Sequence, residues 1–353
     1  MMLPVQNPRR AEEKPFLTIA IPTFNRSSWL KRCVSAALAQ TYQNFEVLVS
    51  DNASTDQTAD ILREFNDCRL RVVRQSTNIG PAPNCAACID EAKGEYVVIV
   101  PDDDKLAPWM LEKCAALIKK EPNLPVVMAI GDIFLAPQDR ILAAKSSRKL
   151  ASGIWDSADI LLEYLNDGLL SMHQCTVLMR TEAVRANGGF ALDCPSASDI
   201  ATYLPLLRFG RAGFINESCG VYSVHDSTQT AGYGLEIRLK DFRRIIELIK
   251  ETAQGATSDP RIRRKLESRT RGFTARHAFG LISSRRGLGE PLWDLLPYFS
   301  QWKTDILAGL PFIGISKTLL RSLAVLLLPK SITNMVRRCL RELRRFSLRK
   351  LEV

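Results

Sequence analysis

The 353-residue sequence lacks several features that define well-known classes of protein. Charges and prolines interrupt its first fifteen residues, so no secretory signal peptide is expected and residues 1–15 are predicted to form a loose tail. Its nine cysteines are odd in number and follow no framework spacing, which argues against a disulfide-stapled secreted domain and for a reducing cytoplasm. Neither G-x-G-x-x-G nor G-x-x-x-x-G-K-S/T is present, which disfavours a dinucleotide enzyme and a P-loop ATPase.

The composition is that of an ordinary globular protein, whereas the charge is unevenly distributed. The apolar fraction is 46% and the charged fraction is 24%. A chain of 353 residues exceeds what one hydrophobic core usually organises, so we expect two domains, or one large domain with an appended region. The net charge is +10, and from Arg238 onward 25 lysines and arginines stand against 10 acids, so the basicity belongs to the C-terminal third.

Short apolar segments alternate with helical patterns in the first half of the chain. The expected strands are 17–22, 45–50, 70–74, 96–100 and 126–130, and the expected helices are 28–39, 55–65, 84–92 and 108–119. Ser54 and Gln57 fit a capping box at the start of the second helix. This alternation predicts an α/β fold with a mostly parallel sheet flanked by helices, whose ligands bind at the carboxyl ends of the strands.

Three consecutive acids follow a continuous apolar run. The predicted strand at 96–100 reads as buried on both faces, and Asp102, Asp103 and Asp104 come directly after Pro101. Neighbouring carboxylates repel one another at neutral pH, so we expect them to bind a hard divalent cation together with the phosphates of a substrate. A solvated acidic turn is the alternative interpretation.

Polar residues also follow the other strands of the predicted sheet. Residues 22–26 follow the first strand, residues 51–56 the second and residues 78–80 the third. All of them are expected to face one crevice, where backbone groups near Thr23 and the Asp51 carboxylate can hold a nucleoside. A cation on the acidic triplet would then neutralise the diphosphate.

The order and spacing of these motifs resemble those of the family 2 glycosyltransferases, which have the Rossmann-like GT-A fold. The segments that carry the resemblance are Ile19–Arg26, Val49–Asp56, Asn78–Gly80, Gly94–Tyr96 and Asp102–Asp104. The resemblance covers roughly residues 16–230. It implies an inverting enzyme of the type that builds bacterial cell-surface polysaccharides from nucleotide-diphosphate sugars.

The resemblance also implies roles for individual residues. It assigns nucleotide-sugar binding to Pro22, Thr23, Asn25, Arg26, Asp51, Asn78, Asp102 and Asp103. It assigns the binding of Mn²⁺ or Mg²⁺ to Asp103, Asp104 and His225, and a purely structural histidine is the alternative for His225. The usual acidic motif is D-x-D followed by a further acid, and Pro101 occupies its first acidic position here. Asp103 is therefore the main expected metal ligand, and Asp102 is expected near the ribose.

The resemblance places the catalytic base at Asp199, downstream of the segment Asn187–Phe190. This carboxylate would accept the proton of the acceptor hydroxyl. Ser198 stands where the family usually has a glutamate, so Asp193 is the second candidate. The alternative role of Asp199 is to cap a helix that begins at Ile200.

The loop after Gly80 departs from the family pattern. Many members carry an arginine before an asparagine in this loop, whereas this chain has Pro83 and Asn84. Asn84 is therefore expected to cap the following helix rather than to contact the donor. Cys85 and Cys88 form a C-x-x-C pair without the further ligands of a zinc site, so they are expected to be small packed side chains.

The basic C-terminal region, residues 235–353, is predicted to be helical. Its apolar segment 315–328 is too short and too interrupted for a bilayer span, and arginines follow it, as in an interfacial segment held against anionic lipids. An ordinary helical subdomain is the alternative. No aromatic interleaving or binding motif accompanies the charge, so nucleic acid is not an expected partner.

Together these observations predict a GT-A domain at residues 16–234, with a nucleotide-binding half at 16–130 and an acceptor half at 131–234. The predicted reaction is metal-dependent, inverting transfer of one sugar from a nucleotide-diphosphate sugar to a hydroxyl of a glycan or lipid-linked glycan. No Q-x-x-R-W motif is present, which favours single addition. The expected location is the cytoplasm, or the cytoplasmic face of the inner membrane. A sugar-phosphate nucleotidyltransferase and a non-enzymatic membrane- or RNA-binding protein are the alternatives.

Overall fold

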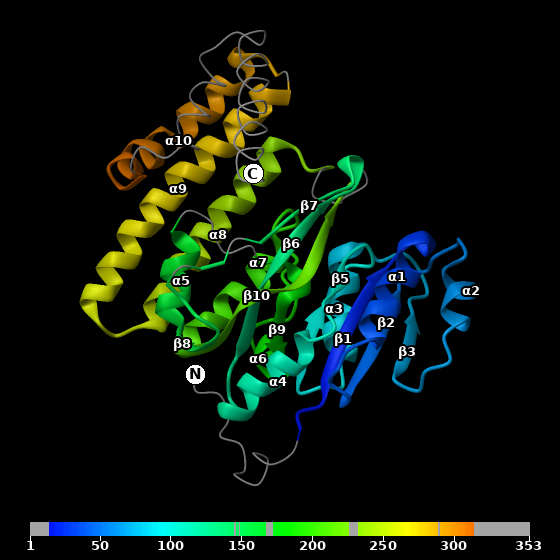
Figure 1. The fold of residues 1–353 in the computed structure, drawn as a ribbon. Helices are drawn as coiled ribbons and strands as arrows, with labels where there is room; N and C mark the ends of the chain where they lie inside the picture. The colour runs from blue at the N-terminus through cyan, green and yellow to red at the C-terminus, as the bar shows by residue number, and fades with distance from the viewer. Residues whose placement is uncertain are drawn as a thin grey trace, which may run out of the picture. The chain divides into compact units, whose positions relative to one another are not determined.

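A computed structural model describes residues 14–144, 146–147, 149–166, 172–225, 232–288 and 290–313. The chain divides into two compact units, coloured along the sequence in Figure 1. One unit extends to Tyr233 and also includes Lys240–Glu267. The other unit contains Gly234–Leu239 and the residues from Ser268 onward.

The first unit is built on a ten-stranded sheet in the order β3-β2-β1-β4-β9-β6-β10-β5, with β7 paired to β6 and β8 paired to β10. The strands are β1 (Leu17–Thr23), β2 (Phe45–Asp51), β3 (Leu70–Arg74), β4 (Tyr96–Ile99), β5 (Lys105–Leu106), β6 (Val126–Leu135), β7 (Arg140–Leu142), β8 (Gly153–Asp156), β9 (Val177–Arg180) and β10 (Arg211–Val224). The first four strands are mutually parallel, as predicted. Strand β9 pairs antiparallel with β4 and β6, so the sheet becomes mixed beyond β4.

Helices connect these strands and make up the described part of the C-terminal region. They are α1 (Ser27–Leu38), α2 (Thr58–Arg63), α3 (Pro81–Glu91), α4 (Met110–Lys120), α5 (Ser157–Leu165), α6 (Thr181–Ala186), α7 (Ser198–Tyr203), α8 (Leu235–Ala256), α9 (Pro260–Leu288) and α10 (Leu292–Ile313). The α/β fold class and the helical C-terminal region are thereby confirmed. The apolar segment 315–328 and the arginines after it lie outside the described residues. Among the described helices, none has both the length and the apolar character needed to span a bilayer.

Two of the predicted helix starts are wrong. Helix α2 begins at Thr58 without a side-chain cap, because the Ser54 hydroxyl instead accepts the backbone N–H of Asn25 at 2.9 Å. Helix α3 begins at Pro81, whose ring suits the first helical turn. Asn84 therefore lies inside α3 and does not cap it.

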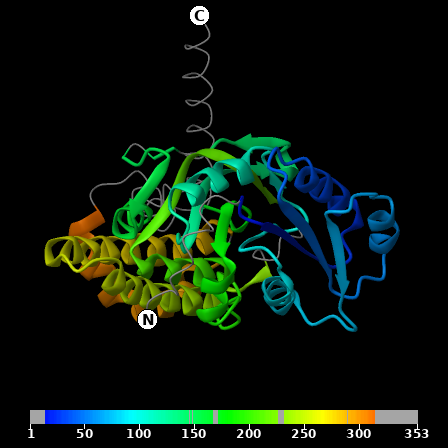
Figure 2. The same cartoon turned by 90° about the horizontal axis from the view of Figure 1, so that it is seen from below.

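The strands nearest the site are buried on both faces. Leu17, Ile19 and Ile21 of β1 join a core cluster with residues of α1 and α4. The alternating residues of β1 point to the opposite face, where α3 packs against β1 and β2. Figure 2 shows α1 and α3 on opposite sides of these strands. The carboxyl ends of the strands thus emerge between rigid, packed elements.

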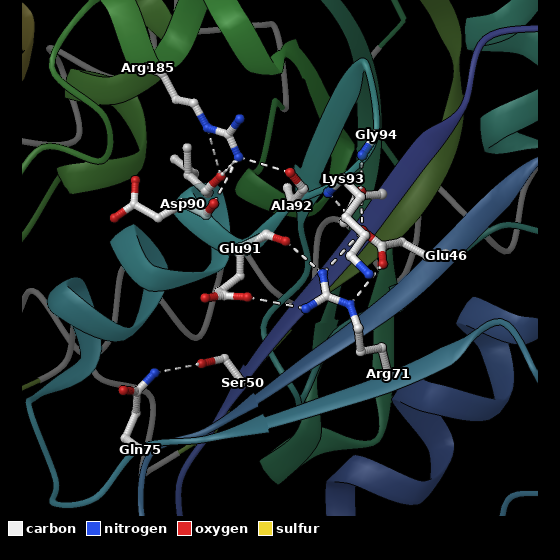
Figure 3. A network of polar contacts seen from close by, with 12 residues as sticks. Glu46, Ser50, Arg71, Gln75, Asp90, Glu91, Ala92, Lys93, Gly94 and Arg185 are labelled. Atoms are coloured by element: carbon white, nitrogen blue, oxygen red, sulfur yellow. Dashed lines mark hydrogen bonds and ion pairs between the residues drawn. The ribbon is translucent and has the colours of Figure 1, made fainter.

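Glu46 is the centre of a polar network that joins the segment before β4 to β1 and β2 (Figure 3). Its carboxylate accepts hydrogen bonds from the Thr18 hydroxyl at 2.9 Å, the Lys93 backbone at 2.8 Å and the Arg71 Nε at 3.1 Å. Gly94 lies so close to β1 that an added Cβ would be 2.6 Å from the Thr18 backbone nitrogen. Close packing against β1 therefore explains why the Gly94–Tyr96 motif begins with a residue that has no side chain.

The end of α3 is held by Arg185 of α6 (Figure 3). The Arg185 guanidinium donates to the carbonyls of Ile89, Asp90 and Ala92 at 2.7, 2.9 and 2.8 Å. These are carbonyls at the C-terminal end of a helix, where a cation is favourable and intrahelical partners are missing. Arg185 thus attaches the C-terminal end of α3 to α6.

Candidate active site

A cavity of about 390 Å³ lies at the carboxyl ends of the parallel strands. Six of the residues assigned to donor or metal binding line it, namely Pro22, Thr23, Arg26, Asn78, Asp102 and Asp103. They come from the last two residues of β1 and from the loops that follow β1, β3 and β4, and Asn52 adds the loop that follows β2. The structure therefore gathers all four strand ends around one cavity.

Asp102 connects the ends of β1 and β4. Its Oδ2 accepts the Thr23 hydroxyl at 2.7 Å, and its Oδ1 lies 3.3 Å from an Arg26 guanidinium nitrogen. Burial raises the pKa of Asp102 to about 6, and Arg26 and Thr23 oppose the rise. This carboxylate is fixed in position and faces the cavity, as a group that accepts ribose hydroxyls must be.

Asp103 lies between two nitrogen-bearing side chains. Its Oδ2 is 2.6 Å from an Arg26 nitrogen and 2.8 Å from His225 Nε2. The His225 ring stacks on Trp29 of α1 with centroids 5.0 Å apart and an interplanar angle of 16°. Packing against the Trp29 ring thus fixes the imidazole while its Nε2 is held at the Asp103 carboxylate.

Asp104 is placed differently from its neighbours. Only 1% of its surface is exposed, it does not line the cavity, and its Oδ1 accepts the Ser223 N–H at 2.8 Å. Burial and the neighbouring Asp103 charge raise the pKa of Asp104 well above its usual range. Asp104 therefore contacts β10, whereas the other two acids line the cavity.

A two-residue strand brings the end of β10 to the acids. Lys105 of β5 pairs antiparallel with Val221 of β10. The Ser223 hydroxyl donates to the Asp103 carbonyl at 2.7 Å, and His225 follows two residues later. The contact between Asp103 and His225, 122 positions apart, thus depends on this short pairing.

The donor set around Asp103 fits a divalent cation that takes further ligands from a substrate. Asp103 Oδ2 and His225 Nε2 are close enough to share one ion, and both are mostly buried. No group of three or more protein ligands with metal-site geometry occurs among the described residues. A cation that is held in part by substrate phosphates needs only one or two protein ligands.

Asn25 joins the loops after β1 and β2. It has a left-handed backbone with φ of 52°, which asparagine tolerates. Its side-chain oxygen accepts the Thr55 N–H at 2.7 Å, and its own N–H donates to the Ser54 hydroxyl. Asn25 does not line the cavity. Its hydrogen bonds instead hold the loop after β1 against the loop after β2.

Asp51 does not line the cavity and lies in a second hollow. This hollow has a volume of about 250 Å³ and is also lined by Leu62, Val72 and Arg74. The Asp51 carboxylate accepts the Ser54 N–H at 2.9 Å and pairs with Arg74 at 2.5 Å. In register, Asp51 is next to Thr23, so the Asp51 and Asp102 positions are neighbours across β1.

Two buried asparagines that were not assigned to the site line the cavity. Asn52 donates to Asn78 Oδ1 at 2.9 Å and to the Gly80 carbonyl at 3.1 Å, and accepts the Ile79 N–H at 2.9 Å. Asn84 accepts the Ser50 hydroxyl at 2.7 Å. They hold the loop after β3 and the start of α3 against β2, which is why Asn78 faces the cavity.

Asp199 lies in the first turn of α7, half-buried and outside the cavity lining. Helix α7 begins at Ser198 with Ala197 at its N-cap position, so the alternative in which Asp199 caps the helix is wrong. Burial raises the pKa of Asp199, and backbone N–H groups of this turn oppose the rise. Asp193, the second candidate, is exposed and lies 3.4 Å from Arg244.

Cys85 lines the cavity and is half-buried. Burial, opposed by a contact with Gln174 and reinforced by the Asp199 charge, raises the pKa of the Cys85 thiol to about 12. Gln174 and Tyr222 complete this wall of the cavity. They precede β9 and lie on β10, and no local pattern in the sequence relates them to the strand ends; only the sheet pairing does.

The geometry can be compared with known proteins. Residues 18–186 match the model of Glycosyl transferase family 2. This segment belongs to the family 2 glycosyltransferases. The chain is 26% identical over 217 residues to an uncharacterized glycosyltransferase of Rickettsia typhi, covering 61% of this chain and 66% of that protein. It is 37% identical over 208 residues to a chondroitin synthase of Escherichia coli, covering 58% of this chain but 28% of the synthase.

Solved structures of other proteins show the same fold as this chain. The S. aureus TarS fragment 1–349 in complex with UDP aligns with a TM-score of 0.57 and 18% identity, covering 91% of this chain and 87% of that one. The mannosyltransferase PcManGT of Pyrobaculum calidifontis, in complex with GDP-Man and Mn²⁺, aligns with a TM-score of 0.52 and 17% identity, covering 89% and 87%. At these identities the likeness establishes the fold.

Proposed function

We propose that this family 2 glycosyltransferase transfers one sugar, with inversion, from a nucleotide-diphosphate sugar to a hydroxyl of a glycan or lipid-linked glycan. The observation that carries the proposal is that Asp102 and Asp103 face the same cavity as residues of the other three strand ends. The names of the similar proteins support it, because they include a chondroitin synthase and structures that contain UDP or GDP-Man.

In this proposal the loops after β1 to β3 hold the nucleoside, and Asp102 accepts the ribose hydroxyls. Asp103 and His225 hold Mn²⁺ or Mg²⁺, and Asp104 supports them through β10. When bound, the cation neutralises the charge that develops on the departing nucleoside diphosphate. The cavity would hold the diphosphate beside these acids.

Asp199 is the proposed base for the acceptor hydroxyl. A raised pKa makes its carboxylate a better proton acceptor than an ordinary surface aspartate. Direct attack of the acceptor oxygen on the anomeric carbon breaks the bond to the diphosphate and inverts the configuration. The proton of the hydroxyl passes to Asp199 as the new glycosidic bond forms.

The first experiment is a thermal-unfolding screen of UDP- and GDP-sugars with and without Mn²⁺. Asp103→Ala is expected to abolish the stabilisation that requires Mn²⁺. Asp199→Asn is expected to keep donor binding and to lose transfer. Asp193→Asn is the matched control, because it removes an exposed carboxylate of the same loop region and is expected to retain turnover. Full turnover by Asp199→Asn would contradict the base assignment.

We also propose peripheral contact between the basic C-terminal region and anionic lipid. The charge balance from Arg238 onward, 25 basic against 10 acidic residues, supports this proposal. Sedimentation with vesicles tests it: binding is expected to vesicles that contain phosphatidylglycerol and not to phosphatidylcholine alone, and to weaken as salt is raised. Equal binding to both vesicle types would contradict it.

A further inference from the structure

Arg26 occupies the position at which the Asp103 carboxylate would meet a cation. One guanidinium nitrogen lies 2.6 Å from Asp103 Oδ2 and 3.3 Å from Asp102 Oδ1. The same Asp103 oxygen is 2.8 Å from His225 Nε2. The oxygen that fits a divalent ion is therefore already engaged by a permanently positive group.

A guanidinium and a divalent cation repel each other at this distance. Both would require the Asp103 oxygen, and two positive groups a few ångströms apart in a partly buried site are unfavourable. Cation binding at Asp103 therefore requires the Arg26 contact to lengthen or break. Asp102 would keep its contact with Thr23, whereas the hydrogen bond between Asp103 and His225 would be replaced by their shared contact with the cation.

Arg26 is suited to such a movement. It stands at the N-cap position of α1, directly after the left-handed Asn25, so its backbone is fixed while its long side chain extends along the cavity wall. The side chain is 27% exposed, against 5% and 7% for those of Asp102 and Asp103. The arginine is thus the more exposed partner of this ion pair, and it lines the cavity that would contain a diphosphate.

We propose that Arg26 is an exchangeable counter-ion: it neutralises Asp102 and Asp103 before donor binding, and transfers its contact to the donor's diphosphate when a cation binds Asp103. This inference rests on the proposed function. Arginine is well suited to the exchange because its planar fork pairs with carboxylate and phosphate oxygens alike. Arg26 is a positioning residue that makes cation and donor bind together rather than separately.

The experiment measures Mn²⁺ binding to the full chain without nucleotide, from the electron paramagnetic resonance signal of free Mn²⁺. Arg26→Gln removes the competing charge and is expected to tighten Mn²⁺ binding on the order of tenfold. At saturating Mn²⁺, the same variant is expected to bind UDP or GDP, whichever the unmodified chain prefers, on the order of tenfold more weakly. The two opposite changes distinguish exchange from a general loss of structure.

Two further variants serve as controls. Arg32→Gln removes a positive charge from the same helix at a residue that lies over the Trp29 ring, and it is expected to leave both affinities within about twofold. Arg26→Lys retains the charge and is expected to keep Mn²⁺ binding without nucleotide close to that of the unmodified chain. If Arg26→Gln folds poorly, Arg26→Met, which also removes the charge and keeps a long side chain, provides the same comparison with Arg26→Lys.

The inference is overturned if Arg26→Gln leaves Mn²⁺ affinity unchanged or lowers it while Asp103→Asn abolishes it. In that case the proposed cation site stands and only the exchange is wrong. If neither the unmodified chain nor Arg26→Gln binds Mn²⁺ with or without nucleotide, both the exchange and the metal dependence of the proposed function are overturned.

Discussion

The substitution Asn52→Asp tests how the loop after β3 is kept at the cavity. Asn52 is 2% exposed and makes three side-chain hydrogen bonds to Asn78, Ile79 and Gly80. Aspartate has the same shape and can still accept the Ile79 N–H. It cannot donate, so two favourable contacts become contacts between a carboxylate oxygen and the oxygens of Asn78 and Gly80.

The cost follows from these contacts. Each lost hydrogen bond removes about 1 kcal/mol, and leaving buried oxygens unpaired adds a desolvation penalty, so the unfolding free energy is expected to fall by about 2–4 kcal/mol. Because Asn78 would leave its position, nucleotide affinity is expected to fall as well.

Urea unfolding followed by circular dichroism measures the change in stability. Asn44→Asp is the matched control, because Asn44 makes a single exposed contact to the Lys14 carbonyl, at 2.7 Å. That substitution is expected to change stability by no more than about 0.5 kcal/mol. If Asn52→Asp is as stable as the control and binds nucleotide as the unmodified chain does, the loop is not held by this side chain.

Two further predictions concern packing and pH. Gly94→Ala is expected to lower the unfolding free energy by roughly 1–3 kcal/mol, because its Cβ would be 2.6 Å from the Thr18 backbone nitrogen. In urea titrations Gly153→Ala, which meets only ordinary contacts, should not be destabilised, and equal effects at the two glycines would be inconsistent with the packing explanation. Burial lowers the pKa of His173 from 6.5 to about 4. Between these two pH values the unfolded chain therefore binds a proton at His173 and the folded chain does not. This contribution to stability is present above pH 6.5 and is lost as the pH falls toward 4, by at most about 3 kcal/mol. Between pH 7.5 and pH 5, the unfolding free energy of His173→Phe should therefore fall less than that of the unmodified chain. Equal falls in the two proteins would contradict the lowered pKa of His173.

Local patterns in the sequence predicted the first half of the fold closely. The expected strands 17–22, 45–50, 70–74 and 96–100 agree with β1 to β4 to within one residue at each end. Runs of apolar residues between turn signals specify such strands without reference to the rest of the chain. The position of the acidic triplet at the end of a buried strand was predictable for the same reason.

The roles of the individual acids could not be predicted in this way. Adjacent in sequence, Asp103 and Asp104 differ because one faces the cavity and the other accepts an N–H of β10. Asn84 was expected to cap a helix, whereas the approach of α3 to β2 turns it into a buried partner of Ser50.

The sequence by itself determined the first four strands and the polar, acidic segments that follow them, because apolar runs and turn residues act over a few positions. Only the tertiary structure decided which groups meet those acids. His225 and Gln174 reach the site through strand pairings between segments far apart in the chain. Arg26 meets Asp103 because β1 and β4 are neighbours in the sheet. Such contacts depend on how whole elements pack, and no local pattern of residues encodes that packing.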